Sequence, residues 1–349
     1  MSTWSDLKNN PRLKKVYDQR IAIIKLIREF FWSLNFVETE TPIAMHLPGQ
    51  EPYLNPVPVK FFDPASKAAD FYLHTSPELA MKKLLAAGYE KIFQIVKCFR
   101  NYESFGGTHN PEFTMVEWYR APGKYQDIMD DTENLFKFVG EKLNKQKVKY
   151  NNKEIDIFQK WERLSMKELW QKFINVNLDD YLEIEKLRNL AVERGFSATA
   201  DDAYEDLFFK IFLNEIEPNL GNVVPVFVYD FPAQMTSLSR LCEHDNRYAE
   251  RFELYIGGLE LANAFGELTD PDEQKERLEK DRELRAKLGK ATWPVDPDFI
   301  AALGSLPAIA QRATAGIALG VDRMVVLFTE AKDINEVIFG SVSDQILNS

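Results

Sequence analysis

Residues 99–121, FRNYESFGGTHNPEFTMVEWYRA, constrain the fold more than any other part of this chain of 349 residues. The apolar run KIFQIVKCF precedes Arg100, and a polar loop with glycines separates it from a second run of alternating character. This pattern predicts an antiparallel hairpin over residues 91–120. On the returning strand, the period of two places one set of side chains on the same face, namely Phe113, Met115, Glu117 and Tyr119.

A carboxylate among apolar neighbours is unusual in a purely structural sheet, because a buried charge needs a partner. Glu117 shares its face with an aromatic ring and a phenol, and Arg100 ends the other strand of the hairpin. A site for ATP and a cationic substrate would use each of these groups. The hairpin is therefore the first candidate for a functional site.

Composition narrows the class of protein. The chain is 45% hydrophobic and 13% aromatic, enough for a substantial core in one large domain or two ordinary ones. It has no apolar run of 18 residues and no apolar leader, so we expect a cytoplasmic protein without a membrane span. Two cysteines, Cys98 and Cys242, are too few for a disulfide framework or a zinc site. A net charge of −11 argues against a large nucleic-acid surface.

Apolar spacing and turn signals predict an α+β fold. Antiparallel strands alternate with blocks of helices, and we find no internal repeat. Helices are expected over 11–35, 76–88, 125–147, 165–175, 182–195, 201–215 and 271–289. Besides the first hairpin, strands are expected near 36–42, over 222–232, over 251–265 and at the start of 316–328.

The hairpin at 251–265 carries a second candidate site. With Gly257-Gly258 as a two-residue turn, Tyr255 pairs with Glu260, and Glu253 pairs with Ala262. Glu253 and Glu260 then become diagonal neighbours, roughly 7–8 Å apart, and could hold one Mg²⁺. The alternative is a solvated hairpin with two surface glutamates. In a flat strand Asn263 and Glu267 face the other way, and they join the site only if the strand bends near residues 262–264.

A third candidate lies in GIALGVDRMVVLF, residues 316–328, which predicts a strand running into a helix. Arg323 follows Gly320 near the start of that helix, which we expect to be the last one. An arginine beside free backbone N–H groups suits an anionic ligand. A surface salt bridge is the alternative. No Walker-type phosphate loop is present.

Together these units resemble the catalytic core of class II aminoacyl-tRNA synthetases. NFVETETP is similar to motif 1, FRNYES…HNPEFTMVEWY to motif 2 and GIALGVDR to motif 3, while TSPEL and GLELANAFGEL resemble the lysyl subgroup. The resemblance runs from about residue 12 to 340. It implies an antiparallel sheet flanked by helices, and a homodimer formed through motif 1.

Within this group the chain resembles the family of elongation factor P β-lysine ligases. Motif 1 begins near residue 20, which leaves no room for the anticodon-binding OB-fold of lysyl-tRNA synthetases, so we expect a single catalytic domain over 1–349. ELANAF, VYDFPA, EWYRA and the alanine of GIALGVDR, Ala318, are also similar to the ligases. The resemblance implies lysine or β-lysine as substrate, elongation factor P as acceptor and tRNA as an improbable one.

The resemblance also implies residue roles, with ATP and Mg²⁺ as cofactors. Arg100 and Arg323 would be catalytic, gripping the α- and γ-phosphates. The expected ATP-binding residues are Arg100, Glu103, His109, Asn110, Glu112, Phe113, Glu253 and Arg323. Glu253 and Glu260 would hold the metal. The expected amino-acid-binding residues are Ser76, Glu78, Glu117, Tyr119, Asn263, Glu267 and Ala318.

Several of these residues have an ordinary alternative. Phe113 suits core packing, and His109 suits a loop without metal-ligand spacing around it. Glu78 suits the first turn of a helix, where its charge complements the dipole, and Ser76 suits a helix cap. These alternatives remain open from the residues alone.

The chain departs from the family pattern at three positions. Thr108 stands where an arginine usually precedes His-Asn-Pro, Tyr102 replaces a usual glutamate, and Ala264 replaces a usual glycine. If that glycine requires a positive φ, Ala264 strains or reshapes the strand. The departures bear on the acceptor and on the choice between α-lysine and β-lysine.

The resulting hypothesis is ATP-dependent activation of lysine or (R)-β-lysine as an adenylate, followed by transfer to a lysine side chain of elongation factor P. A truncated lysyl-tRNA synthetase that charges tRNA or another acceptor is one alternative. A catalytically silent paralogue with a binding role is the other. The first hypothesis requires the two glutamates of the second hairpin and the two arginines to converge on one nucleotide.

Overall fold

The computed structural model describes residues 3–347, and the chain forms two compact units. The first unit comprises Met1–Lys124 and Thr269–Ser349, and the second comprises Tyr125–Leu268. A single catalytic domain over 1–349 stays a prediction, and its outermost residues, 1–2 and 348–349, lie outside the described part. Each unit is described by itself below.

The sheet of the first unit has the order β1-β5-β6-β13. β5 and β6 form the predicted hairpin, and β13 pairs antiparallel with β6, whereas β1 pairs parallel with β5. The strand-to-helix unit predicted at 316–328 is confirmed, since β13 runs directly into α11. The strands are β1 (Val37–Glu38), β5 (Lys91–Phe99), β6 (Glu112–Arg120) and β13 (Ala315–Gly320), and α11 spans Val321–Thr329.

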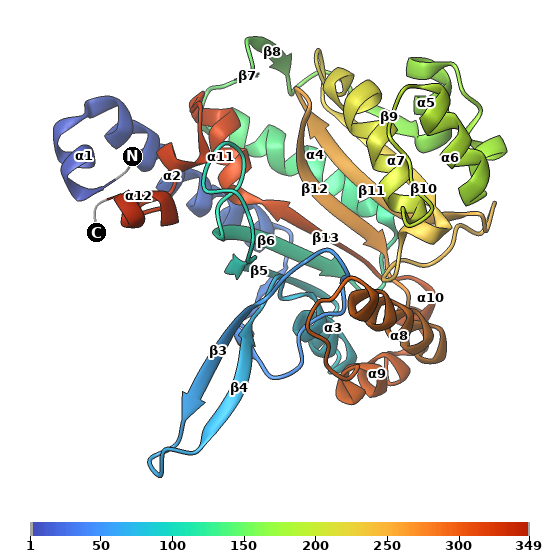
Figure 1. Cartoon of the computed structure of the whole chain (residues 1–349). Coiled ribbons are helices and arrows are strands. Elements are labelled where there is room, and N and C mark those ends of the chain that lie inside the picture. Colours follow the sequence, from blue (N-terminus) through green and yellow to red (C-terminus); the bar gives the residue numbers. More distant parts are fainter. Residues whose placement is uncertain (1–2, 348–349) are drawn as a thin grey trace. The chain divides into compact units, whose positions relative to one another are not determined.

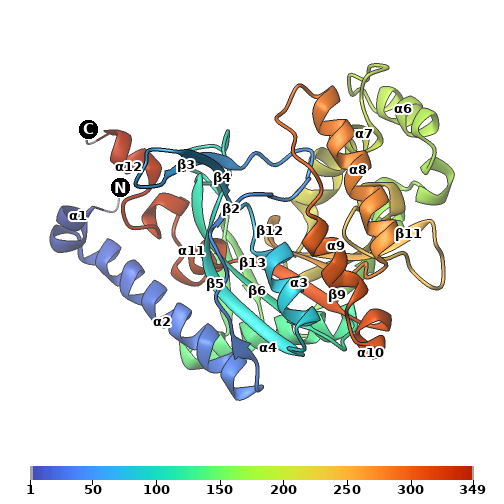
Figure 2. The same cartoon turned by 90° about the horizontal axis from the view of Figure 1, so that it is seen from below.

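The longest helix of the first unit is α2, Pro11–Ser33, predicted as 11–35. The Asn10 side chain accepts hydrogen bonds from the backbone N–H groups of Arg12 and Leu13, and proline occupies the first helical position. The buried face of α2 packs beside α11 (Figure 2). The other helices are α1 (Trp4–Asn9), α3 (Glu78–Ala86), α8 (Pro271–Lys287), α9 (Pro297–Gly304), α10 (Ala308–Arg312), η5 (Ile334–Glu336) and α12 (Val342–Leu347).

Two predictions about these helices need correction. The helix expected over 76–88 begins at Glu78, so Ser76 precedes the cap position, although its hydroxyl accepts from the Glu78 N–H at 3.0 Å. The helix that carries Arg323 is not the last one, because α12 follows it. Figure 1 shows α12 close to α1, so both ends of the described chain lie in one region of the first unit.

A small three-stranded sheet was not predicted from the sequence. Its order is β2-β4-β3, with antiparallel pairing throughout. The strands are β2 (Ala44–Met45), β3 (Val57–Phe62) and β4 (Ala68–Leu73). Figure 1 shows β3 and β4 as an arm that extends from the first unit.

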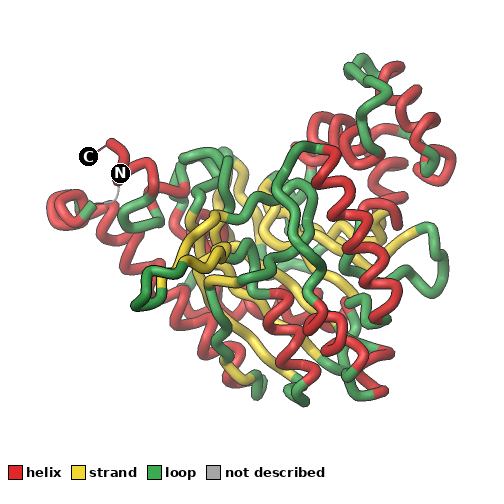
Figure 3. Tube along the Cα trace, turned by 60° about the horizontal axis from the view of Figure 1, so that its bottom comes forward, coloured by secondary structure: helices red, strands yellow, loops and turns green. Residues whose placement is uncertain are grey.

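The sheet of the second unit has the order β12-β11-β10-β9, in which only the β10–β9 pair is parallel. Side chains from the helices and from β10 and β11 form one large apolar core, which includes Trp170, Phe208, Phe212 and Phe231. Figure 3 shows these helices in red beside yellow strands. The strands are β7 (Lys147–Tyr150), β8 (Lys153–Asp156), β9 (Glu162–Ser165), β10 (Val226–Pro232), β11 (Tyr248–Ile256) and β12 (Leu259–Gly266).

The helices of the second unit follow the predictions with shifted ends. The helix predicted over 125–147 stops at Lys142, because Lys147 already begins β7. The helix predicted over 201–215 is α7 followed by a π-helical turn, η2. The helices are α4 (Tyr125–Lys142), α5 (Met166–Ile174), η1 (Leu178–Tyr181), α6 (Ile184–Glu193), α7 (Tyr204–Ile211), η2 (Phe212–Ile216), η3 (Glu217–Asn219) and η4 (Ala233–Met235).

Each unit therefore combines a largely antiparallel sheet with helices, which confirms the α+β prediction. Cys98 and Cys242 are both buried and do not form a disulfide. Among the described residues, none of the helices combines the length and apolar character that crossing a bilayer requires.

Candidate active site

The β5–β6 hairpin of the first unit holds Arg100 against an aromatic ring. Arg100 follows β5, and its backbone N–H donates to the Pro111 carbonyl at 2.9 Å. Its guanidinium carbon lies 5.0 Å from the centroid of the Phe113 ring. The Arg100 Nε is buried and has no hydrogen-bond partner among the described residues. A cation with an unused buried donor favours an anionic ligand such as a phosphate.

The Glu117 carboxylate on β6 is fully buried. Its Oε1 accepts a hydrogen bond from Ser76 Oγ at 2.6 Å, and its Oε2 accepts one from the Tyr119 hydroxyl at 2.8 Å. Burial, and secondly the nearby charge of Glu78, raise the pKa of Glu117 to about 8. At neutral pH this group therefore holds a proton, and an incoming ammonium would make it ionise.

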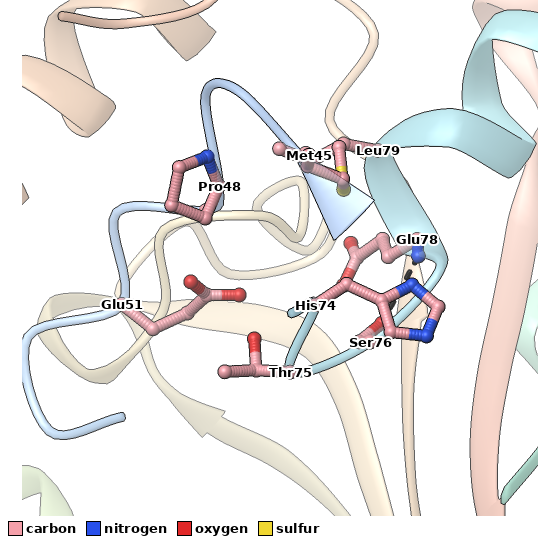
Figure 4. A pocket seen from close by; sticks show the side chains of 9 residues that line it. Met45, Pro48, Glu51, His74, Thr75, Ser76, Glu78 and Leu79 are labelled. Atoms are coloured by element: carbon pink, nitrogen blue, oxygen red, sulfur yellow. Dashed lines mark hydrogen bonds between the residues drawn. The ribbon is translucent and has the colours of Figure 1, made fainter. Parts of the chain in front are cut away.

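A small pocket lies beside these groups and is shown in Figure 4. Glu78, at the start of α3, and Glu51 both direct carboxylates toward it (Figure 4). Burial raises the pKa of Glu51, and the charge of Glu78 adds to that effect. A concave site with two acidic side chains suits an amine. The lining residues are Met45, Pro48, Gly49, Glu51, His74, Thr75, Ser76, Glu78 and Leu79.

Glu78 already has a cationic partner within its own helix. Lys82 Nζ donates to Glu78 Oε1 at 2.6 Å, and the Lys82 side chain is only 2% exposed. Sequence reasoning missed Lys82, although its position four residues after Glu78 could have shown the pair. Any ammonium bound by Glu78 would share the carboxylate with Lys82.

Ala318 lies next to Glu117 in the sheet, and its role in amino-acid binding stays a prediction. On β13 it pairs with Glu117 across the strand, so the two side chains share a face of the sheet. Ala318 also packs against a small apolar cluster of Val96, Cys98 and Met115. Its methyl group therefore borders the place where a ligand of Glu117 would lie.

Arg323, at the start of α11, contacts the loop between β5 and β6. Its Nε donates to the Thr108 carbonyl at 3.3 Å, and its Nη2 lies 3.1 Å from His109 Nε2. Thr108, the departure from the usual arginine, hydrogen bonds through Oγ1 with His109 Nδ1 at 3.1 Å. The structure thus brings His109 and Arg323 together, at a helix N-terminus that favours anions.

The other predicted residues in and beside the loop between β5 and β6 differ in their contacts. Asn110 is buried: its Nδ2 donates to the Glu112 carbonyl at 2.5 Å, and its Oδ1 accepts from the Val342 N–H. The Glu112 carboxylate forms an ion pair with Lys97 at 3.2 Å. Glu103 is half-buried, and the side chain of Tyr102 is 87% exposed. Asn110 therefore has a structural use that the sequence did not reveal.

A buried polar network joins three elements of the first unit and was also missed. The Asp322 carboxylate on α11 binds the guanidinium of Arg20 on α2 and accepts the Thr114 N–H of β6 at 2.7 Å. Arg20 also donates to Thr114 Oγ1 at 2.8 Å. The network connects the segments that resemble motifs 1, 2 and 3. It fixes the helix that carries Arg323.

The second unit carries the other predicted carboxylates on the β11–β12 hairpin. Tyr255 pairs with Glu260 as predicted, but the pairing of Glu253 with Ala262 was wrong, because Glu253 pairs with Asn263. The register shifts at Leu261, which has no partner on β11. This bulge lies before residues 262–264, where a bend was considered.

The register shift decides which side chains share a face. Because Asn263 lies opposite Glu253, it faces the same way as Glu253 and Glu260. Two further steps of two residues bring Glu267 to that face as well. The expectation that Asn263 and Glu267 face away from the glutamates in a flat strand is therefore corrected. Glu267 is buried, and its backbone forms an isolated antiparallel β-bridge with Ser239.

Glu253 is buried and held on both oxygens. Arg251 donates to its Oε1 at 2.7 Å, and the Tyr255 hydroxyl donates to its Oε2 at 2.6 Å. Burial raises the pKa of Glu253, and the charge of the half-buried Glu260 raises it further. Arg251 Nε also donates to Asn263 Oδ1 at 3.2 Å. Two neighbouring carboxylates that repel each other fit a divalent cation with oxygen ligands.

Most of the predicted residues fall into two sets, one in each unit. The first set lies in the first unit: Ser76, Glu78, Arg100, His109, Phe113, Glu117, Tyr119, Ala318 and Arg323. The second set lies in the second unit: Glu253, Glu260, Asn263 and Glu267. The convergence of both sets on one nucleotide stays a prediction.

Comparison with known proteins identifies the family. The model of tRNA synthetases class II (D, K and N) matches residues 2–341. The chain belongs to this class II synthetase family. Its members are ligases, and those that activate amino acids use ATP and Mg²⁺ in general.

Two kinds of curated relative match this class II chain. One is the elongation factor P–(R)-β-lysine ligase of Pseudoalteromonas translucida, 39% identical over 92% of this chain and 93% of that protein. Another is the ligase of the same name from Klebsiella pneumoniae, 37% identical over 97% of both chains. The lysine–tRNA ligase of Campylobacter jejuni strain RM1221 is 38% identical over 95% of this chain. The match covers 64% of the length of that ligase.

Proposed function

We propose that the chain activates lysine or (R)-β-lysine with ATP and transfers the aminoacyl group to a lysine side chain of elongation factor P. The single observation that carries this proposal is the buried Glu117 carboxylate, which two hydroxyl groups orient in a class II fold. A buried group of this kind is costly unless a ligand uses it. An ammonium is the ligand whose charge it compensates.

Amino-acid selection follows from charge. Glu117, with Ser76 and Tyr119 fixing its orientation, binds the side-chain ammonium of the substrate. Glu78, which lines the neighbouring pocket, binds the other amine. Ala318 limits the space beside Glu117, and one methyl group in a pocket discriminates by about 1–3 kcal/mol. Asn263 and Glu267 complete the set proposed for the substrate.

The chemistry needs no covalent nucleophile. The substrate carboxylate attacks the α-phosphorus of ATP, and pyrophosphate leaves. The acceptor amine then attacks the acyl carbon of the adenylate, AMP leaves, and the amine loses a proton. Arg100 stabilises negative charge that develops on the α-phosphate, and Arg323 binds the γ-phosphate. Mg²⁺, held by Glu253 and Glu260, would neutralise the phosphates.

The acceptor is proposed from relatives and from local residues. Relatives named elongation factor P–(R)-β-lysine ligase match over 93–97% of their length. ELANAF and Ala318 favour the same branch. Lysine–tRNA ligases of nearly equal identity make tRNA, or another acceptor, the second candidate. We propose a homodimer that acts in the cytoplasm on elongation factor P.

The test measures both half-reactions. ATP–pyrophosphate exchange is assayed with lysine and with (R)-β-lysine, and elongation factor P is then weighed by mass spectrometry after incubation. We expect exchange with at least one isomer and a mass gain of one lysyl residue on elongation factor P. Arg100→Ala should lower the exchange rate roughly 10²–10³-fold, because a donor to the developing charge is lost.

The matched control is Arg282→Ala, which removes a half-buried arginine of α8 that pairs with Glu279. It should leave exchange unchanged. Charging of tRNA without modification of elongation factor P would favour the second candidate. Absence of exchange with either isomer, together with no ATP binding by calorimetry, would refute activation and favour a silent paralogue with a binding role.

A further inference from the structure

Three side chains of different chemistry meet in the second unit, apart from the carboxylates assigned above. Asp230 lies on β10, and Cys242 and His244 lie in the segment between β10 and β11. Cys242 Sγ is 3.3 Å from Asp230 Oδ1, and His244 Nε2 is 3.2 Å from Asp230 Oδ2. One ligand atom from each residue lies within 4.8 Å of the other two.

These separations approach those around a bound metal, although the two short contacts go to different oxygens of Asp230. Tetrahedral zinc has bonds of about 2.0–2.3 Å to nitrogen, oxygen and sulfur, so its ligand atoms lie roughly 3.3–3.8 Å apart. The cluster needs only small side-chain movements to reach that spacing. Thiolate, imidazole and carboxylate together are ligands typical of Zn²⁺ rather than of Mg²⁺ or Ca²⁺.

The backbone aims Asp230 at this cluster. Asp230 has a φ of +58°, and the pairing of β10 with β11 shifts register between Tyr229 and Phe231. A bulge of this kind redirects a side chain, and Asp is one of the few residues other than glycine that accept such a φ. The carboxylate is thereby placed between Cys242 and His244. The Tyr125 hydroxyl also donates to its Oδ1 at 3.1 Å.

The electrostatic surroundings favour a cation. The carboxylates of Asp230, Glu250 and Asp245 lie near the Cys242 thiol. A metal would bind this group as thiolate, with release of its proton. The His244 side chain is 66% exposed, so an ion can enter from solvent.

We propose that Asp230, Cys242 and His244 bind one Zn²⁺, with water in the fourth position, and so fasten the segment between β10 and β11. In the sequence, the number of cysteines alone argued against a zinc site. One cysteine is enough when a histidine and an aspartate supply the other protein ligands. The proposal does not depend on the proposed function. A metal-free hydrogen-bonded cluster is the alternative that the experiment must separate from it.

The experiment uses the whole chain without a histidine tag, freed of metal by a chelator. Zn²⁺ alone is titrated in competition with a chromophoric chelator, and Co²⁺ is then added as a spectroscopic probe. We expect one Zn²⁺ per chain and a thiolate-to-Co²⁺ charge-transfer band. Cys242→Ser should abolish the band, and Cys242→Ser and His244→Ala should each weaken Zn²⁺ binding at least about tenfold.

The control is His46→Ala, which removes an exposed histidine of the first unit and should leave binding unchanged. Circular dichroism shows whether each variant is folded, and His244→Ala changes an exposed side chain, so it remains informative if Cys242→Ser unfolds. Failure of the parent chain to bind Zn²⁺, or equal binding by the parent and His244→Ala, would overturn the proposal.

Discussion

At the scale of single residues, Glu117 shows how burial creates a binding group. Its two oxygens accept hydrogen bonds from Ser76 and Tyr119, which favours the ionised form. Burial and the charge of Glu78 outweigh these bonds, and the pKa rises to about 8. In the free protein the Glu117 carboxyl therefore carries a proton, which is released when an ammonium ligand binds.

The protonated Glu117 carboxyl predicts that a proton is released when the amino acid binds. Below pH 8 the carboxyl of the free protein is protonated, and the bound ammonium favours the carboxylate, so binding frees a proton. Affinity for lysine or β-lysine should fall by up to about tenfold per pH unit as the pH is lowered from 8 toward 6. Calorimetry in buffers of different ionisation enthalpy measures the released proton directly.

Glu117→Gln removes the titrating group from the same site. It should abolish the proton release and weaken binding roughly 10–100-fold, since a hydrogen bond to a charged group is lost. Glu193→Gln, at an exposed position of α6, serves as the matched control. Proton release that persists in Glu117→Gln would show that another group titrates.

At the scale of elements, the buried pair of Arg20 and Asp322 fastens α2, β6 and α11 to one another. Both side chains are at most 8% exposed. Removing one partner of such a pair leaves an uncompensated charge away from water, which costs more than the pair itself contributes.

Asp322→Asn should therefore lower the free energy of unfolding by about 3–5 kcal/mol. The amide keeps the shape of the carboxylate but not its charge, so Arg20 stays buried without compensation. Urea unfolding followed by circular dichroism measures the change. Glu279→Gln removes a partly exposed ion pair with Arg282 and should cost less than about 1 kcal/mol. Equal effects of the two variants would contradict this account.

The structure of β12 shows that Ala264 does not strain the backbone. This residue is fully buried, pairs with Phe252 and is not among the described residues of positive φ. Its methyl group is therefore compatible with the extended backbone and contributes to packing. The strand was reshaped by the bulge at Leu261 instead.

Ala264→Gly should consequently destabilise the protein by about 1–2 kcal/mol, since it loses a buried methyl group and adds backbone entropy to the unfolded chain. The midpoint of urea unfolding should fall without a change in slope. A stabilised Ala264→Gly variant would mean that alanine strains this strand after all.

At the scale of the whole molecule, two compact units each bury a core of their own, and the chain carries a net charge of −11. The segment that resembles motif 1 leaves large apolar side chains in solvent: Ile21 is 57% exposed, Trp32 52% and Val37 47%. Ile21 and Trp32 lie eleven residues apart on α2, which is about three turns, so they share one face. This face is expected to contact a second copy of the chain.

Trp32→Glu should convert a homodimer to monomers, because it places a charge in an apolar contact. Sedimentation velocity at several protein concentrations measures the change. Val192→Glu alters a side chain of α6 that is 57% exposed and should leave the assembly as it is. A monomeric parent chain would contradict the prediction at once.

Much of the fold followed from local patterns. The β5–β6 hairpin was predicted because two runs of strand character flank a polar loop, and on β6 Phe113, Met115, Glu117 and Tyr119 follow one another at intervals of two. The helix α2 was predicted because its apolar residues recur at helical spacing, and the structure shows that Asn10 and Pro11 define its start. Short elements such as β3 and β4 carry weak patterns and were missed.

The sequence by itself determined the family, the order of the main helices and hairpins and the candidate residues, because motifs and periodicity are local properties of the chain. Only the tertiary structure decided which side chains share a face. Leu261 and Ala262 are consecutive buried residues between the polar Glu260 and Asn263, and the bulge at Leu261 places Asn263 opposite Glu253. Packing, not local preference, also raised the pKa of Glu117 and brought Asp230, Cys242 and His244 together, since burial and contact arise only when distant segments meet.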